Sequence, residues 1–170
     1  AQFPRLTLGM AYFFGGQLQQ AENILQSCLN FCEKNGLGQL SVISQTFLAP
    51  ILIAKGDMKR GTELLEKAQK NFIRNQRKVW YALSENILGE VNSHIATGPK
   101  PSLSIMAKNF SFLVKNFPSA GKKAEEHFNK AIELFQEIGV KGFLGQSYLS
   151  LGQLYKASNR TDQARQGTSP

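Results

Sequence analysis

The chain has 170 residues, and its 20 Lys and Arg residues exceed its 12 Asp and Glu residues, which gives a net charge of +8. No apolar run approaches the roughly 18 residues that a membrane-spanning helix needs, and the first five residues lack the basic-then-apolar order of a secretory signal. The composition argues against an integral membrane protein and a secreted protein, and we expect a soluble, cytoplasmic one.

A leucine followed by a small residue recurs along the chain at a pitch of 40 residues. The pairs are Leu8-Gly9, Leu48-Ala49 and Leu88-Gly89, and the small residues Gly16 and Ala21 return as Gly56 and Gly61. Self-similarity at such a period is typical of a solenoid of helical hairpins. We therefore expect an all-α superhelix, with residues 1–170 forming one continuous array that binds partners.

The first two hairpins are predicted at about residues 3–35 and 38–75. Gly15-Gly16 and Gly56-Asp57 predict the turns inside them. Gly or Ala is expected where two helices cross closely, because a larger side chain would push the backbones apart. The expected crossing residues are Gly9, Ala21, Ala49 and Gly61, and the expected core residues are Leu8, Tyr12, Leu25, Leu48, Leu52 and Leu65.

Two cysteines, Cys28 and Cys32, lie four residues apart on one face of the predicted second helix. This spacing strains a disulfide. The sequence has no other cysteine, so we interpret the two as small buried thiols, expect no metal site, and expect a reducing compartment.

The third hairpin, at about residues 78–138, contains an insertion near residues 95–121. The next Leu-Gly pair, at Leu151, follows Leu88 by 63 residues, which is 23 more than the pitch. Prolines mark the limits of the insertion. Six apolar residues inside it follow helical spacing and predict one amphipathic helix: Leu103, Met106, Phe110, Leu113, Val114 and Phe117.

The insertion is also basic. No acidic residue occurs between Val91 and Ala124, a stretch that contains Lys100, Lys108, Lys115, Lys122 and Lys123. We favour a helix that packs on the array; docking into a groove of this or another copy is a second interpretation, and a membrane surface is the last, because the lysines are sparse. We expect the lysines to be a solvated face. The alternative is a nucleic-acid-binding helical repeat, which the lack of arginine in this stretch disfavours.

The last hairpin, at about residues 141–166 and cut short, carries the most specific pattern. Its matching residues are Tyr148, Leu151, Gly152, Tyr155 and Ala164, and those of the helix before it are Ala124, Phe128 and Ala131. This pattern resembles the tetratricopeptide repeat (TPR) family, which implies a superhelix that binds proteins or peptides. Arg5, Gln45 and Glu85 depart from it, because they stand where the family has an aromatic residue.

The stretch from Lys122 to Arg165 resembles, more narrowly, the C-terminal repeats of bacterial class III adenylate/guanylate cyclases fused to an ATPase module. This resemblance implies a regulatory, protein-binding part of a longer signalling protein. The chain opens inside a first helix and stops before a last one is complete, which agrees with a fragment. It also implies that the parent protein is a nucleotidyl cyclase or an ATPase.

In the family register, the first helices of the hairpins line a concave groove that binds the partner. On this chain the groove residues are Phe3, Leu6, Met10, Phe13, Phe14, Ile43, Thr46, Ile53, Asn86, Glu90, Gln153 and Lys156. The Lys/Asn/Arg clamp of chaperone-binding members is missing, since Leu6, Met10, Thr46 and Pro50 occupy its places.

The apolar part of this set lies in the first hairpin. One interpretation is an apolar groove that accepts a peptide. We favour another, in which the surface faces a preceding repeat or is shared with a second copy. The partner is thus a protein or peptide, another domain of the same chain, or the chain itself.

The sequence offers no catalytic set. It has no Gly-rich phosphate loop, no nucleophile motif and no metal-ligand spacing. His94 and His127 fall on separate predicted helices with no evident acidic partner. We therefore expect no cofactor and no catalysis in this segment.

Overall fold

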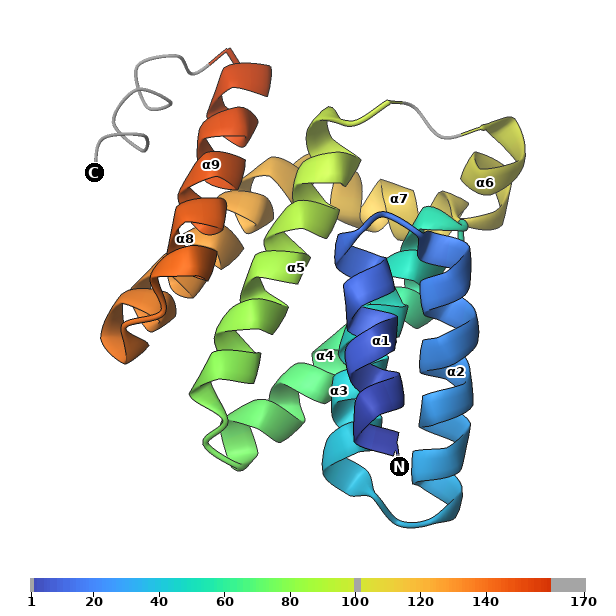
Figure 1. The fold of residues 1–170 in the computed structure, drawn as a ribbon. Coiled ribbons are helices and arrows are strands. Elements are labelled where there is room, and N and C mark those ends of the chain that lie inside the picture. The colour runs from blue at the N-terminus through green and yellow to red at the C-terminus, as the bar shows by residue number, and fades with distance from the viewer. Residues whose placement is uncertain (1, 100–101, 160–170) are drawn as a thin grey trace. The chain divides into compact units, whose positions relative to one another are not determined.

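The computed structural model describes residues 2–99 and 102–159, and within these residues every regular element is a helix (Figure 1). The predicted all-α fold is therefore confirmed. The chain divides into two compact units, residues 1–71 and residues 72–170, and each is described here by itself. The elements are α1 (Gln2–Phe14), α2 (Leu18–Lys34), α3 (Gly38–Ala54), α4 (Met58–Arg74), α5 (Lys78–Thr97), α6 (Leu103–Lys108), α7 (Phe110–Asn116), the 3-10 turn η1 (Phe117–Ser119), α8 (Ala120–Ile138) and α9 (Lys141–Ala157).

Small residues allow the helices of the first unit to approach closely, as the sequence predicts. A Cβ atom on Gly9 of α1 would lie 2.8 Å from Cδ2 of Leu25 on α2. A Cβ atom on Gly61 of α4 would lie 2.6 Å from the carbonyl oxygen of Ala49 on α3. Both distances are shorter than any ordinary carbon contact, so each glycine is required by packing.

The core of the first unit forms where α2, α3 and α4 meet. Leu29, Leu48 and Leu52 are buried together, and Leu64 packs against them. The prediction for Leu8 is wrong, because 46% of this residue is exposed. Gly9, the next residue, faces α2, and adjacent residues of a helix point about 100° apart.

Four successive turns share one backbone geometry and recur every 20 residues, half the period seen in the sequence. Their left-handed residues are Gly16 (φ 72°), Gly36 (φ 68°), Gly56 (φ 85°) and Gln76 (φ 53°). In each turn the next residue donates its backbone N–H to the carbonyl oxygen five residues earlier, at 2.8–2.9 Å. This is the Schellman end of a helix, in which the left-handed position favours glycine. Gln76 is the exception in sequence but not in structure.

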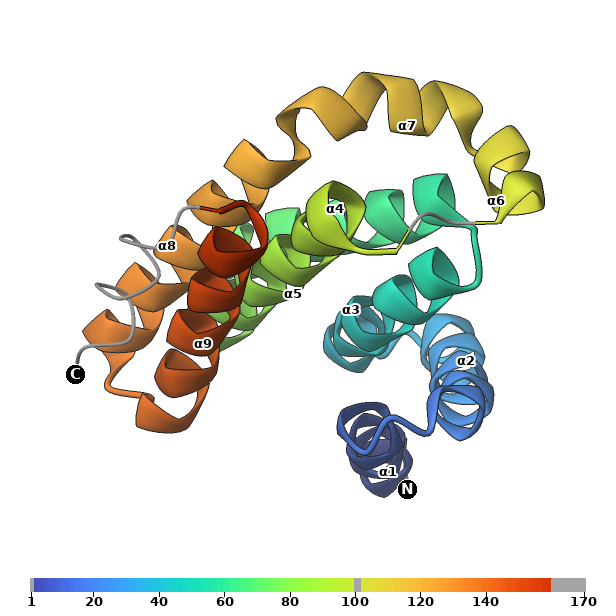
Figure 2. The ribbon, with the colours of Figure 1, turned by 90° about the horizontal axis from the view of Figure 1, so that it is seen from above.

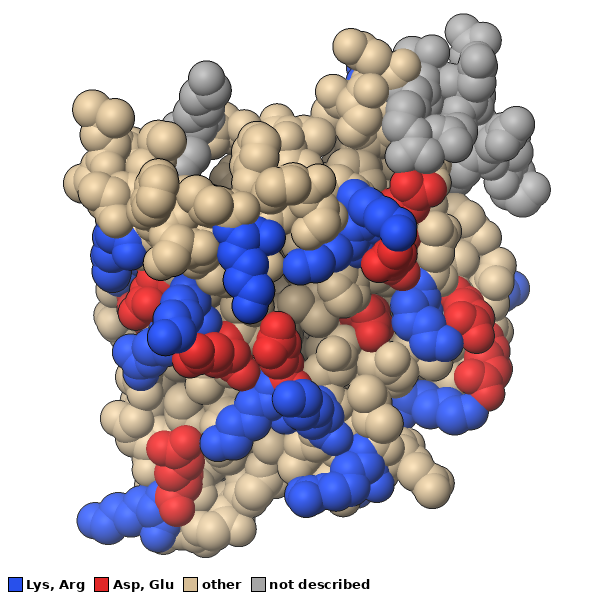
Figure 3. All heavy atoms as spheres, turned by 180° about the vertical axis from the view of Figure 1, so that it is seen from behind, with Lys and Arg blue, Asp and Glu red and all other residues tan. Residues whose placement is uncertain are grey.

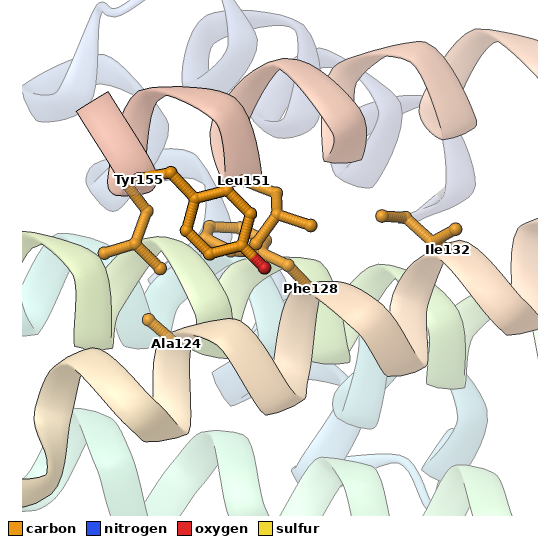
Figure 4. Packing of buried hydrophobic residues seen from close by; sticks show 6 residues of the cluster. Ala124, Phe128, Ile132, Leu151 and Tyr155 are labelled. Carbon is orange, nitrogen blue, oxygen red and sulfur yellow. The ribbon is translucent and has the colours of Figure 1, made fainter. Parts of the chain in front are cut away.

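The second unit packs α8 between α5 and α9. Figure 4 shows Phe128 of α8 beside Leu151 and Tyr155 of α9, in a cluster that also buries Ala124. On the other side, the Phe128 ring occupies the space left by Gly89 of α5, where a Cβ atom would lie 2.5 Å from the ring. The second helix of the last predicted hairpin, with Ala164, lies outside the described residues.

The insertion forms two short helices in place of the single helix predicted. α6 ends and α7 begins at Asn109, whose side-chain amide donates to the carbonyl oxygen of Ile105 at 2.9 Å. An asparagine that binds its own backbone in this way competes with the regular helix. Pro118 lies in η1, directly before α8, and Figure 2 shows α6 and α7 as an arc that leads into α8.

Among residues 2–99 and 102–159, no helix is both long enough and apolar enough to cross a bilayer.

Candidate functional site

The first unit presents an apolar stripe on α1, made of Phe3, Met10 and Phe14. Phe3 is 68% exposed and Phe14 is 57% exposed, whereas Met10 is half-buried. Residues spaced seven and four apart lie on one face of a helix, so these three side chains share a surface. Leu6, which the sequence also assigns to the groove, is only 2% exposed and belongs to the core.

Phe14 is held in place by other aromatic rings. Its ring centroid lies 5.5 Å from that of Phe13 and 5.7 Å from that of Phe47 on α3, both in edge-to-face geometry. Phe13 and Phe47 are in turn 5.5 Å apart. Such contacts hold the exposed Phe14 ring in one position, which lowers the entropic cost of binding a partner there.

The three groove residues predicted on α3 are buried. The exposed fractions are 3% for Ile43, 0% for Thr46 and 8% for Ile53. The Thr46 hydroxyl donates to the carbonyl oxygen of Val42 at 2.9 Å, which satisfies it within its own helix. In this structure these side chains contribute to packing and not to an exposed surface.

In the second unit, hydrogen bonds join α5 to α9. The Ser147 hydroxyl donates to the side-chain oxygen of Asn86 at 2.6 Å, and the Ser150 hydroxyl donates to the carboxylate of Glu90. Asn86 is buried, at 8% exposed, whereas Glu90 is exposed. Two of the predicted groove residues therefore also fix the spacing of the two helices.

The other two predicted residues of this unit, Gln153 and Lys156, are exposed on α9. Leu149, which is 50% exposed, precedes them by one helical turn. The spacing places Leu149, Gln153 and Lys156 on one stripe of α9. With Glu90 they offer an apolar side chain, an amide, a cation and an anion.

A buried ion pair that the sequence does not predict joins α5 to α8. Nδ1 of His127 lies 2.6 Å from a carboxylate oxygen of Glu85, and the Glu85 side chain is only 7% exposed. The expectation that His127 has no acidic partner is therefore wrong. The two residues are 42 positions apart, so only packing brings them together. The one signal in the sequence is that Glu85 replaces the aromatic residue of the TPR pattern.

The same carboxylate affects Tyr81. Burial, followed by the charge of Glu85, raises the pKa of Tyr81 to about 12. The Tyr155 hydroxyl donates to a carboxylate oxygen of Glu125 at 2.8 Å, which adds a link between α9 and α8. These polar contacts fix the relative position of the helices that carry the α9 stripe.

The two cysteines are buried thiols, as the sequence suggests. Both are free, and the sulfur atoms of Cys28 and Cys32 lie 3.9 Å apart. Burial, followed by the negative charge of Cys28, raises the pKa of Cys32 to about 11, which makes it a weak nucleophile at neutral pH. Within the described ranges, no three His, Cys, Asp or Glu residues cluster so as to hold a metal ion.

Basic residues of α8 lie beside acidic ones. Lys122 pairs with Glu126 at 3.6 Å and Lys130 pairs with Glu133 at 2.9 Å. Figure 3 shows basic and acidic side chains interleaved over much of the face that it draws. This helix therefore does not present the unbroken positive surface that phosphate backbones favour.

Comparisons with known proteins support the fold. No family model matches the sequence, and no curated protein matches it. The chain is similar to the solved structure of BtubC (BKLC) from P. vanneervenii, with a TM-score of 0.66 and 18% identity over 98% of this chain and 60% of that one. It is also similar to a putative kinesin light chain of Podosopora anserina with nearly identical TPR-like repeats, with a TM-score of 0.40 and 17% identity over 96% of this chain and 90% of that one.

The chain thus spans about 60% of the length of BtubC. At this level of identity the likeness extends to the fold, a TPR-like array of helical hairpins, and to nothing more specific.

Proposed function

We propose that the chain is a protein-interaction scaffold and that the α9 stripe of Leu149, Gln153 and Lys156, together with Glu90 of α5, binds a peptide segment of a protein partner. The observation that carries this proposal is the pair of serine hydrogen bonds, from Ser147 and Ser150, which fix α9 against α5. A surface held in position in this way binds with little loss of side-chain freedom.

The chemistry of the stripe defines the kind of peptide. Gln153 has both a donor and an acceptor, so it suits a peptide backbone. Lys156 and Glu90 carry opposite charges and suit a segment with charges of both signs around an apolar side chain. The sequence lacks the carboxylate clamp, so an acidic C-terminal chaperone peptide is not the expected ligand.

The apolar stripe of the first unit suits a different contact. Phe3, Met10 and Phe14 have no charged residue among them, so the matching surface is an apolar helix, either of another repeat or of a second copy of the chain. Analytical ultracentrifugation would distinguish the two. Loss of self-association in Phe3→Ser and Phe14→Ser variants supports a second copy, and a wild-type monomer supports another repeat.

The cellular setting rests on weaker grounds. Two free, buried thiols, Cys28 and Cys32, suit a reducing compartment such as the cytoplasm. The resemblance of residues 122–165 to cyclase repeats supports a regulatory, non-catalytic role beside a bacterial nucleotidyl cyclase or ATPase module. The residues encoded immediately before Ala1 test this, because such a module has recognisable phosphate-binding and metal-binding motifs.

The peptide-binding proposal is tested by selecting binders from a random peptide library on the immobilised chain and measuring their dissociation constants by calorimetry. We expect the Gln153→Ala/Lys156→Ala variant to bind a selected peptide about tenfold or more weakly, as for central interface residues. The matched control is Asn129→Ala/Lys130→Ala on α8, which should change the constant less than twofold. Equal effects of the two double variants would show that the α9 stripe is not the binding face.

A further inference from the structure

The insertion has an exposed apolar face in addition to the face that it buries. Ile105, Phe112 and Leu113 are partly buried, and Asn109 is 5% exposed. A helix that only packs on its own protein would be polar on its remaining surface. Here the remaining surface is apolar. The exposed residues are Leu103 (85%), Met106 (40%), Phe110 (69%), Val114 (60%) and Phe117 (58%).

These five side chains form one surface. They are spaced three or four residues apart along α6, α7 and η1, which is the spacing of a single helical face. The segment forms an arc that precedes α8 (Figure 2). The first interpretation drawn from the sequence, in which the helix buries these residues against the array, does not describe them, since of the six residues predicted for this face only Leu113 is partly buried.

The charge on this segment has one sign. Lys108, Lys115 and Lys122 recur every seven residues, so they follow one side of the segment, and no acidic residue occurs from Val91 to Ala124. Lys108 and Lys115 are exposed. In the upper part of the face drawn in Figure 3, a broad band of uncharged side chains lies above basic ones.

We infer that the α6–α7 face binds the surface of an anionic phospholipid membrane. The apolar side chains would enter the boundary between headgroups and acyl chains, and the lysines would contact phosphate and carboxylate headgroups. The segment lies on the membrane and does not cross it. The inference does not depend on the peptide-binding stripe of α9.

Two other occupants fit less well. A second copy of the chain would bring two positive segments together, in a chain whose net charge is already +8. A folded protein partner recognises a pattern of donors, acceptors and charges of both signs, whereas this face offers apolar side chains and lysine only. A uniform negative surface that is soft enough to admit five unevenly placed side chains matches it best.

The test is co-sedimentation of the 170-residue chain with vesicles of phosphatidylcholine alone or with about one third phosphatidylserine. We expect sedimentation with the anionic vesicles only, and release as salt screens the charges. The Lys108→Gln/Lys115→Gln variant should bind about 30-fold more weakly, from about 1 kcal/mol per lysine near an anionic surface. The matched control, Lys67→Gln/Lys70→Gln on α4, should bind like the wild type.

The apolar contribution is tested with Phe110→Ser/Phe117→Ser, which should lose vesicle binding, and with Phe31→Ser/Leu149→Ser, which changes exposed apolar residues elsewhere and should retain it. Circular dichroism shows whether each variant remains helical. The inference is overturned if the wild type fails to sediment with anionic vesicles, if neutral vesicles bind equally, or if both lysine variants behave alike. A wild-type dimer that Phe110→Ser/Phe117→Ser dissociates, with no vesicle binding, would assign the face to a second copy.

Discussion

A single methyl group added at Gly61 should destabilise the first unit, whereas the same methyl group at Gly145 should stabilise the second. In Gly61→Ala the new Cβ atom would lie 2.6 Å from the carbonyl oxygen of Ala49 and 2.5 Å from Cγ1 of Ile53. The carbonyl belongs to the backbone of α3 and cannot rotate away. Helices α3 and α4 would therefore have to separate by about 1 Å. At Gly145 of α9, nothing lies within 4 Å of the new atom.

The pair of variants isolates the steric cost. Each gains helix propensity of about 1 kcal/mol, since alanine is favoured over glycine inside a helix. Overpacking costs typically 1–3 kcal/mol. Gly145→Ala should thus raise the free energy of unfolding by about 1 kcal/mol, and Gly61→Ala should lie about 1–3 kcal/mol below it, which is about 2–12 °C in melting temperature for a chain of this size.

The assay is urea denaturation followed by circular dichroism, with thermal melting as a second measurement. Because unfolding of two units need not be a single transition, the signal of Trp80 reports on the second unit separately. If Gly61→Ala proves as stable as Gly145→Ala within about 0.5 kcal/mol, the tight crossing of α3 and α4 is not what requires glycine, and the packing argument fails.

Three further predictions concern single positions. Gln76→Gly should raise the free energy of unfolding by up to about 1 kcal/mol by relieving the left-handed backbone, while Gly56→Gln should lower it by a similar amount; equal denaturation midpoints would contradict this. Cys32 is protonated in the folded state up to a pKa of about 11 but ionises near 9.0 when unfolded, so stability should fall as the pH rises from about 9 to about 11; a Cys32→Ala variant with the same fall in urea titrations would contradict the assignment. Glu85→Ala should cost about 1–3 kcal/mol, because it leaves a partly buried ring nitrogen of His127 without its partner; a double-mutant cycle with His127→Ala that gives no coupling energy would show that the ion pair is not stabilising.

The sequence is sufficient for the helical hairpins because they depend on local chemistry repeated at a fixed spacing. Gly9, Ala49 and Gly61 mark the crossings whichever helices they meet, and Gly16 and Gly56 mark turns through their backbone freedom alone. A Leu-Gly pattern that returns every 40 residues is therefore enough to predict antiparallel helices and the approximate position of the insertion.

The sequence is less informative where one residue type serves two purposes. Gln76 adopts the left-handed turn without being glycine, so the 20-residue period is hidden, and Asn109 ends α6 through a side-chain hydrogen bond that an asparagine in a helix does not always form. Thr46 and Ile43 were assigned to a groove from their register, but helical register gives a direction and not the presence of a neighbour in that direction.

The candidate site depends on tertiary structure for the same reason. Asn86 meets Ser147 across 61 residues and Glu85 meets His127 across 42, and no local pattern encodes such contacts. The sequence by itself determined that this protein is an array of helical hairpins, because turns and close crossings are set by the residue present. Only the packed structure decided which polar groups are paired and which apolar side chains, such as Phe14 and Phe110, remain exposed, because burial depends on what lies opposite.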